Sequence, residues 1–169
     1  MKQIPIRRLL KRADAVFSVW IRARDRRCVT CGATGKLQCS HLIRRGKHSV
    51  RFSEVNCHTQ CSSCNWKHNY FPEKYTSWLL STHGELAYLT LVKDAMKLKS
   101  WKRYELESIV EKYKLPLEKE IVDEILHNSE IVKRGIDWKK FWNDYSKRRT
   151  VHDIDAGAVQ SLIEEQLKG

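Results

Sequence analysis

Four cysteines in two C-x-x-C pairs are the residues of this sequence whose types and spacing point most directly to chemistry. The pairs are Cys28/Cys31 and Cys61/Cys64. Two thiolates separated by two residues can hold one metal ion from a tight turn, and two such pairs complete the tetrahedron of ligands that Zn²⁺ prefers. Disulfides or unrelated structural cysteines are the alternative. Two matched pairs, with Gly32 directly after the first, favour a structural zinc site.

The segment between the two pairs is longer than a zinc ribbon needs. It holds 29 residues, whereas about 15–20 are usual in such ribbons. Residues 37–43 and 50–55 have strand character and flank a basic turn, and a helical run follows the second pair. The sequence therefore predicts a β-hairpin and a helix that zinc pins together, with His41 on the first strand.

Several residues of this region carry a resemblance to a nuclease family. They are Phe17-Ser18, Ile21 to Asp25, Cys28-x-x-Cys31-Gly32, Ser40-His41, the block Arg51 to Asn65, Asn69 and Tyr75. This pattern resembles the HNH, or ββα-metal, nucleases, and within them the four-cysteine zinc branch that includes phage endonuclease VII. It is most similar to the phage recombination nucleases of the lambda Rap/NinG type. The resemblance covers about residues 8–115, and the block 51–65 is its most specific part.

The resemblance assigns catalytic roles to two residues. His41 matches the general base that activates water, a task that suits a neutral imidazole near pH 7. Asn56 matches the asparagine that ties the hairpin together and orients the base.

The resemblance also implies a catalytic Mg²⁺ or Mn²⁺ ion, which prefers oxygen ligands. Asn65 matches the ligand position directly after the second cysteine pair, although an asparagine there could equally cap a helix. Asn69, one helical turn later, and His58 are further candidates. Ser40 stands where many members of the family have an acidic ligand before the base, and this departure favours a non-catalytic role.

The basic charge of the chain is concentrated in its first third. The net charge is +12, and residues 1–51 carry all of it, because they hold fourteen Lys/Arg and two acidic residues. A solvated basic surface does not explain this segregation, whereas binding to a phosphate backbone does. In the hairpin, Arg44, Arg45, Lys47 and Arg51 are predicted to clamp DNA phosphates. Such contacts position DNA without reading its sequence, so selectivity for branched DNA is more natural than site-specific restriction.

The elements that position these residues are mostly helices. We predict an α+β protein with a basic amphipathic helix in 1–27, a zinc-stapled HNH core in 28–71, completing helices in 72–115 and a helical appendage in 116–169. A break is expected at Gly84 in the third part. In the appendage, Asp137 is expected to cap a helix, and the role expected of the appendage is dimerisation or contact with branched DNA.

Composition narrows the remaining possibilities. No stretch is long and apolar enough to span a membrane, and the basic N-terminus does not have the pattern of a signal peptide. A cytoplasmic protein is expected, in the host cytoplasm if a phage encodes it. Six cysteines then favour metal over disulfides, and Cys39 and Cys57 are expected to be small buried residues beside the hairpin.

The function that these observations predict is metal-dependent endonuclease cleavage of branched DNA, such as Holliday junctions and D-loops. The alternative is a non-catalytic zinc module that binds branched DNA or a recombination partner. A homodimer is possible in either case.

Overall fold

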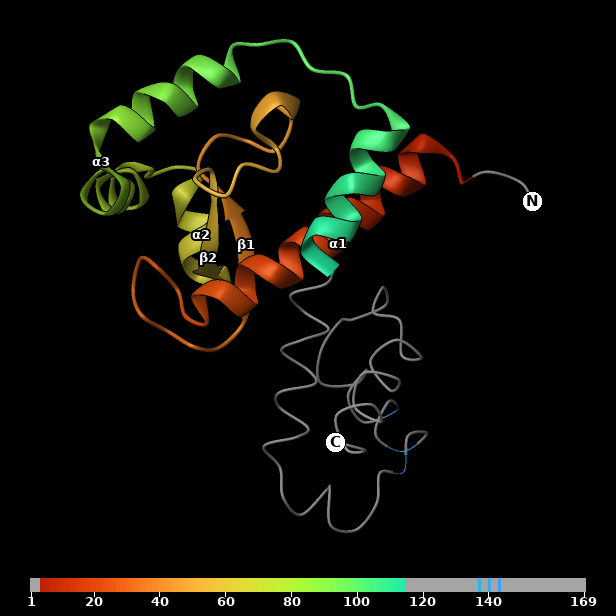
Figure 1. Cartoon of the computed structure of the whole chain (residues 1–169). Coiled ribbons are helices and arrows are strands. Elements are labelled where there is room, and N and C mark those ends of the chain that lie inside the picture. The colour runs from red at the N-terminus through yellow and green to blue at the C-terminus, as the bar shows by residue number, and fades with distance from the viewer. Residues whose placement is uncertain (1–3, 115–136, 138–139, 141–142, 144–169) are drawn as a thin grey trace, which may run out of the picture.

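The computed structural model describes residues 4–114 and the single positions 137, 140 and 143. The elements are α1 (Ile6–Asp25), β1 (Leu37–His41), the short 3₁₀ helix η1 (His48–Val50), β2 (Cys57–Cys61), α2 (Ser62–His68) and α3 (Glu73–Ala95), followed by a helical run over 103–114 (Figure 1). This is the mostly helical α+β arrangement that the sequence predicts. The appendage 116–169 lies outside the described residues apart from three positions, where Asp137 Oδ1 accepts a hydrogen bond from the Lys140 N–H (3.0 Å), as expected of a cap.

The sheet consists of β1 and β2, which pair antiparallel with His41 opposite Cys57 and Leu37 opposite Cys61. The predicted return strand over 50–55 is wrong, because β2 begins only at Cys57. Val50 instead ends η1 and is buried in a small core, and residues 51–55 form turns. Tertiary packing of Val50 therefore overrides the strand propensity of this segment.

Helix α1 lies within the predicted helical segment 1–27, begins directly after Pro5 and packs along one face of the hairpin. Its buried residues recur at helical spacing and share a core with Cys57 of β2 and with the 103–114 helix, which lies beside α1 in Figure 1. The members of this core are Leu9, Ala13, Val16, Phe17, Ile21, Cys57, Leu106, Val110 and Tyr113. Ile6, in the first turn, is exposed and lies outside this core.

The C-terminal end of α1 is fastened to β2 by side chains as well as by apolar packing. Asp25 Oδ2 accepts a hydrogen bond from the Thr59 N–H (2.7 Å), and Thr59 Oγ1 donates to the carbonyl of Ile21 (3.1 Å). Arg24 donates to the carbonyl of Cys57 (2.9 Å). These bonds fix the position of α1 relative to the strand that leads into the second cysteine pair.

Helices α2 and α3 contact each other, and α2 packs on both strands of the hairpin. The predicted break lies within α3, where Gly84 has φ 81° and ψ 165°, a conformation that is essentially restricted to glycine. The two arms of α3 supply Leu79, Leu91 and Ala95 to the small core around Val50. Among the described residues, no helix is long and apolar enough to cross a membrane.

Candidate functional site

The four cysteines of the two C-x-x-C pairs converge at one end of the hairpin. Their Sγ atoms all lie within 4.8 Å of one another, and those of Cys31 and Cys61 are 3.8 Å apart. Zn–S bonds of about 2.3 Å in a tetrahedron place neighbouring sulfurs about 3.8 Å apart. The arrangement therefore fits the predicted structural zinc ion.

The backbone around the cysteines has the turns that such a site requires. Gly32 has φ 77°, and its N–H donates to the carbonyl of Cys28 (2.8 Å). In the second pair, the Cys64 N–H donates to Cys61 Sγ (3.5 Å) at the start of α2. Burial raises the pKa of Cys28, but nearby backbone N–H groups outweigh this effect and lower the pKa to about 7. This thiol is accordingly prepared to bind as a thiolate.

His41 lies at the end of β1, half-buried, with its ring held by a backbone carbonyl. Nε2 is 3.0 Å from the carbonyl oxygen of Arg51. Because a carbonyl oxygen only accepts, Nε2 carries the proton and Nδ1 keeps its lone pair. Burial lowers the pKa of His41 to about 4, and the charges of Arg45 and Arg51 act in the same direction. His41 is therefore neutral near pH 7, which is the state that a general base needs.

Asn56 is fully buried and ties together the connection between the strands. Its Oδ1 accepts from the Ile43 N–H (2.7 Å), and its Nδ2 donates to the carbonyls of Ile43 and Val50 (3.0 Å each). Val50 directly precedes Arg51, whose carbonyl holds His41. The contacts of Asn56 are thus those of a positioning residue for the proposed base.

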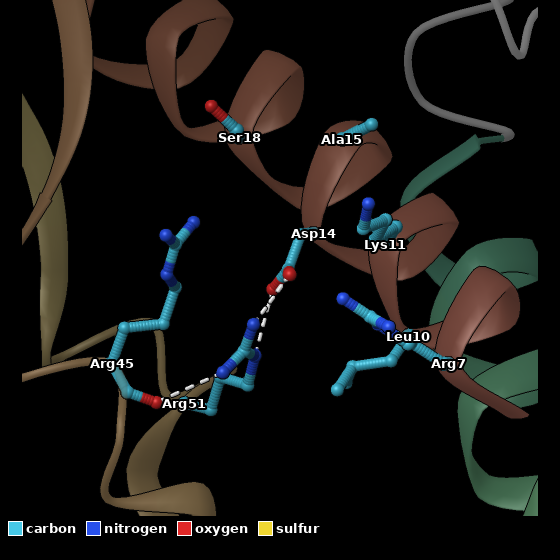
Figure 2. Close-up of a pocket in the computed structure, with 8 residues that line it drawn as sticks. All are labelled: Arg7, Leu10, Lys11, Asp14, Ala15, Ser18, Arg45 and Arg51. Carbon is cyan, nitrogen blue, oxygen red and sulfur yellow. Dashed lines mark hydrogen bonds and ion pairs between the residues drawn. The ribbon is translucent and has the colours of Figure 1, made fainter.

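A cationic cavity of about 550 Å³ opens between α1 and the loop after β1 (Figure 2). His41 does not line it but contacts the carbonyl of Arg51, one of the lining residues. Its lining consists of Arg7, Leu10, Lys11, Asp14, Ala15, Ser18, Arg45 and Arg51. Arg51 donates to both carboxylate oxygens of Asp14 (2.8 and 2.5 Å) and to the carbonyl of Arg45 (3.0 Å). Since this ion pair is internally balanced, the excess positive charge of the lining comes from Arg7, Lys11 and Arg45.

The structure thus divides the four predicted phosphate-binding residues. Arg45 and Arg51 line the cavity, whereas Arg44 and Lys47 are exposed on the adjoining loop and are not part of its lining. The sequence places Arg7 and Lys11 in the basic N-terminal helix, which can lie along a phosphate backbone, but does not bring them to the hairpin residues. Their spacing of four residues puts them on one face of α1, but only the packing of α1 on the hairpin shows that this face meets Arg45.

The residues predicted as ligands of a catalytic ion make hydrogen bonds to other groups in this structure. Alternation along β1 places His41 and Gln38 on opposite faces of the hairpin, and Asn65 Nδ2 donates to Gln38 Oε1 (2.7 Å). Asn69 is exposed and donates to the carbonyls of Asn65 and Trp66, both at 3.2 Å. The amide of Asn65 therefore contacts the face of the hairpin opposite to that of His41.

The ring of His58 makes hydrogen bonds within a buried network. This network lies on the face of the hairpin that also carries Gln38, the partner of Asn65. His58 Nδ1 lies 3.1 Å from Tyr75 Oη and its Nε2 lies 3.1 Å from His83 Nε2. Burial lowers the pKa of His58 to about 3, so its imidazole is neutral. Ser40 Oγ, on the same strand face, is buried and has no hydrogen-bond partner in the described part of the chain.

Together these residues do not fit a Mg²⁺ site. The two groups of possible metal ligands found among the described residues contain cysteine and histidine but no carboxylate. Mg²⁺ binds oxygen ligands, commonly carboxylates. Asn65, Asn69 and His58 consequently stay a prediction from the resemblance.

Removing one zinc ligand should unfold the core. Apparent zinc-binding free energies of about 10–16 kcal/mol in small zinc domains are as large as the whole stability of a domain, about 5–15 kcal/mol. We expect Cys61→Ser to be largely unfolded by circular dichroism and to carry no zinc by elemental analysis. Ser63→Ala, an exposed change between the same two cysteines, should retain both properties. A well-folded wild-type protein without zinc would contradict the assignment.

Asn56→Ala should destabilise the protein strongly. The change strands one N–H and two carbonyls in a buried setting, each at a cost of about 1–3 kcal/mol, so we expect a loss of about 3–5 kcal/mol in urea unfolding. Asn69→Ala is the matched control, because its amide is exposed and contacts only its own helix end. Equal effects of the two substitutions would show that Asn56 does not hold the connection.

Comparison with known proteins gives one family. The family model described as the bacteriophage lambda NinG protein matches residues 2–121, which includes α1, both cysteine pairs, the hairpin, α2, α3 and the 103–114 helix. Searches among curated proteins and among solved structures found no match. Since the matched stretch covers well over half of the sequence, the chain belongs to the bacteriophage lambda NinG protein family, which supports a role related to phage recombination.

Proposed function

We propose that the protein is a DNA endonuclease of phage recombination that cleaves branched DNA, such as Holliday junctions and D-loops. The observation that carries this proposal is that His41, a neutral imidazole with a fixed proton, contacts the backbone of Arg51, which lines a cavity with excess positive charge. Phosphodiester hydrolysis requires a general base for the attacking water and positive charge that binds the phosphate. Both lie on the same side of the hairpin.

In the proposed reaction, Arg7, Lys11 and Arg45 hold a backbone phosphate in the cavity. His41 Nδ1 accepts a proton from a water molecule, whose oxygen attacks the phosphorus as the bond to the leaving oxygen breaks. Positive charge along the cavity stabilises the negative charge that develops on the phosphate and on the leaving oxygen. The ion pair between Asp14 and Arg51 keeps the carbonyl that orients His41 in place.

The nature of the contacts supports selection by DNA shape. Side chains of arginine and lysine on phosphates position a duplex but carry no information about its bases. In the described residues, the cations of the cavity come from two elements, α1 and the loop after β1. A substrate whose backbone changes direction, as at a branch, suits such a two-sided site better than a straight duplex.

A non-catalytic module that binds branched DNA is the second candidate. The observation that favours it is the absence of a carboxylate from the metal-ligand groups of the described residues, together with Ser40 at the acidic position. Incubation of the purified protein with labelled junctions and linear duplexes, with Mg²⁺, Mn²⁺ or EDTA, separates the two. Cleavage that EDTA abolishes supports the metal-dependent enzyme, and binding without cleavage under every condition supports the module.

His41→Ala should separate catalysis from binding. We expect cleavage of a junction to fall by about 10²–10⁴-fold, the usual contribution of a positioned general base, while zinc content and junction affinity stay near wild type. His48→Ala, in η1, is the control and should cleave normally. Normal cleavage by His41→Ala would exclude this histidine as the base, and His58 would then be tested next.

Charge reversal in the cavity should weaken binding to all DNA shapes. We expect the double variant Lys11→Glu/Arg45→Glu to bind both junction and linear duplex more weakly. The slope of the logarithm of the binding constant against the logarithm of the salt concentration should be smaller in magnitude by about two, because two phosphate contacts are lost. Lys74→Glu/Lys93→Glu makes the same change of charge on exposed residues of α3 and should have a smaller effect. Equal salt slopes for the two double variants would contradict the cavity as the phosphate site.

A further inference from the structure

A second group of possible metal ligands lies on the hairpin, apart from the four-cysteine site. It consists of Cys39, His41 and Cys57, and one ligand atom from each lies within 4.8 Å of the other two. The sequence interpretation leaves the two cysteines as small buried residues. The structure instead places both beside the proposed general base.

The register of the hairpin brings the three residues together. His41 lies directly opposite Cys57 on the neighbouring strand, and Cys39 precedes His41 by two residues and so points to the same face. Cys57 is fully buried in the core under α1, whereas Cys39 and His41 are half-buried. An ion can therefore reach the group from the side of Cys39 and His41.

The chemistry of the three donors selects the kind of ion. Two thiolates and one imidazole form a ligand set of zinc enzymes, in which three protein ligands leave a fourth position open. Thiolates favour Zn²⁺ and other borderline or soft ions over Mg²⁺. Two thiolates would also balance the double charge of the ion. Burial raises the pKa of Cys57 well above its ordinary value, and its thiol donates to the carbonyl of Arg51 (3.5 Å), so an ion would displace this proton on binding.

The surroundings of His41 match those of a metal-binding histidine. Such a histidine usually donates its second ring N–H to a carboxylate or a backbone carbonyl, which fixes the ring. His41 Nε2 makes this bond to the carbonyl of Arg51 at 3.0 Å. Only Nδ1 then keeps a lone pair, so a metal ion and a proton from water compete for the same atom.

A disulfide explains the geometry less well. Cys39 is paired with Thr59 and Cys57 with His41, so the two cysteines lie diagonally across the strands rather than opposite each other. Diagonal neighbours are further apart than direct partners. A disulfide would also leave the histidine in the group without a role.

We propose that Cys39, His41 and Cys57 form a second metal site, which takes Zn²⁺ or a similar thiophilic divalent ion, and that occupancy of this site inhibits cleavage by removing the base. The inhibitory part depends on the function proposed above, and the binding part does not. The four-cysteine site stabilises the fold, whereas this site reports the availability of metal.

Metal binding by the full chain tests the site without any measurement of activity. The probes are Zn²⁺, quantified by elemental analysis after dialysis, and Co²⁺, whose thiolate charge-transfer absorption counts bound sulfur ligands. We expect wild type to hold one more ion than Cys39→Ser or Cys57→Ala. Ser40→Ala, on the same strand but the opposite face, should hold as many ions as wild type.

Each result of this measurement either supports or overturns the proposed second metal site. A wild-type protein with no ion beyond that of the four-cysteine site overturns the proposal, as does a Cys39→Ser variant that keeps the additional ion. A Cys39–Cys57 disulfide, recovered in place of the ion after purification without reductant, also overturns it. If Cys57→Ala does not fold by circular dichroism, Cys39→Ser decides the result, because Cys39 is only half-buried.

Inhibition is tested by cleavage with added Zn²⁺, each variant being compared with its own rate in the absence of added Zn²⁺. In wild type the loss should approach the about 10²–10⁴-fold expected from removal of a general base, and in Cys39→Ser it should be much smaller. Equal losses in both proteins overturn the inhibitory role. If wild type cleaves no substrate at all, the proposed nuclease function fails together with the inhibitory role, while the binding measurement still supports or overturns the site.

Discussion

The position of every candidate functional residue depends on how a hairpin of two five-residue strands is held in place. Two such strands are not stable by themselves in water. Four thiols at one end and the amide of Asn56 at the other close the hairpin from both sides. Between these two points, Asp25 and Thr59 join the strand to α1. The zinc ion that fits the four thiols would therefore stabilise far more than its immediate neighbours, because it fixes one end of this system.

The alternation of the strands then separates two kinds of chemistry. One face of the hairpin carries Cys39, His41 and Cys57 toward α1, where the cationic cavity lies. The other face carries Ser40 and His58 toward α3, where buried aromatic and imidazole rings pack together. The first face has a lone pair, positive charge and access to solvent. The second is closely packed and neutral, which fits a structural role.

Local patterns in the sequence predict much of this molecule. The spacing of the cysteines predicts their convergence, the apolar periodicity predicts α1, and Gly84 predicts the break in α3. The predicted strand over 50–55 is wrong, because the burial of Val50 depends on α3, which is remote in sequence. Periodicity describes one element at a time and does not reveal which distant element will cover it.

The candidate site shows the same limit more clearly. The sequence identifies His41 as a candidate base and gives its neighbours along the strand. The face of the hairpin that each of these residues occupies, however, depends on the register in which the two strands pair. The family pattern assigns Asn65 and His41 to one catalytic site, whereas in the structure Asn65 bonds to Gln38, on the face of the hairpin opposite to His41. Arg7 and Lys11 are recognisable only as part of a basic helix until α1 is packed against the loop that holds Arg45.

The two cysteine-containing groups also differ in what an ion would have to displace. In the four-cysteine group, backbone N–H groups already lower the pKa of Cys28, and all four ligands are thiols. In the hairpin group, an ion would compete with a proton for Nδ1 of His41 and would find three protein ligands in the described part of the chain. Fewer thiolates and an open position mean weaker binding to the second group. The first ion would therefore be retained at metal concentrations at which the second exchanges, so that folding and inhibition would respond to metal over different ranges.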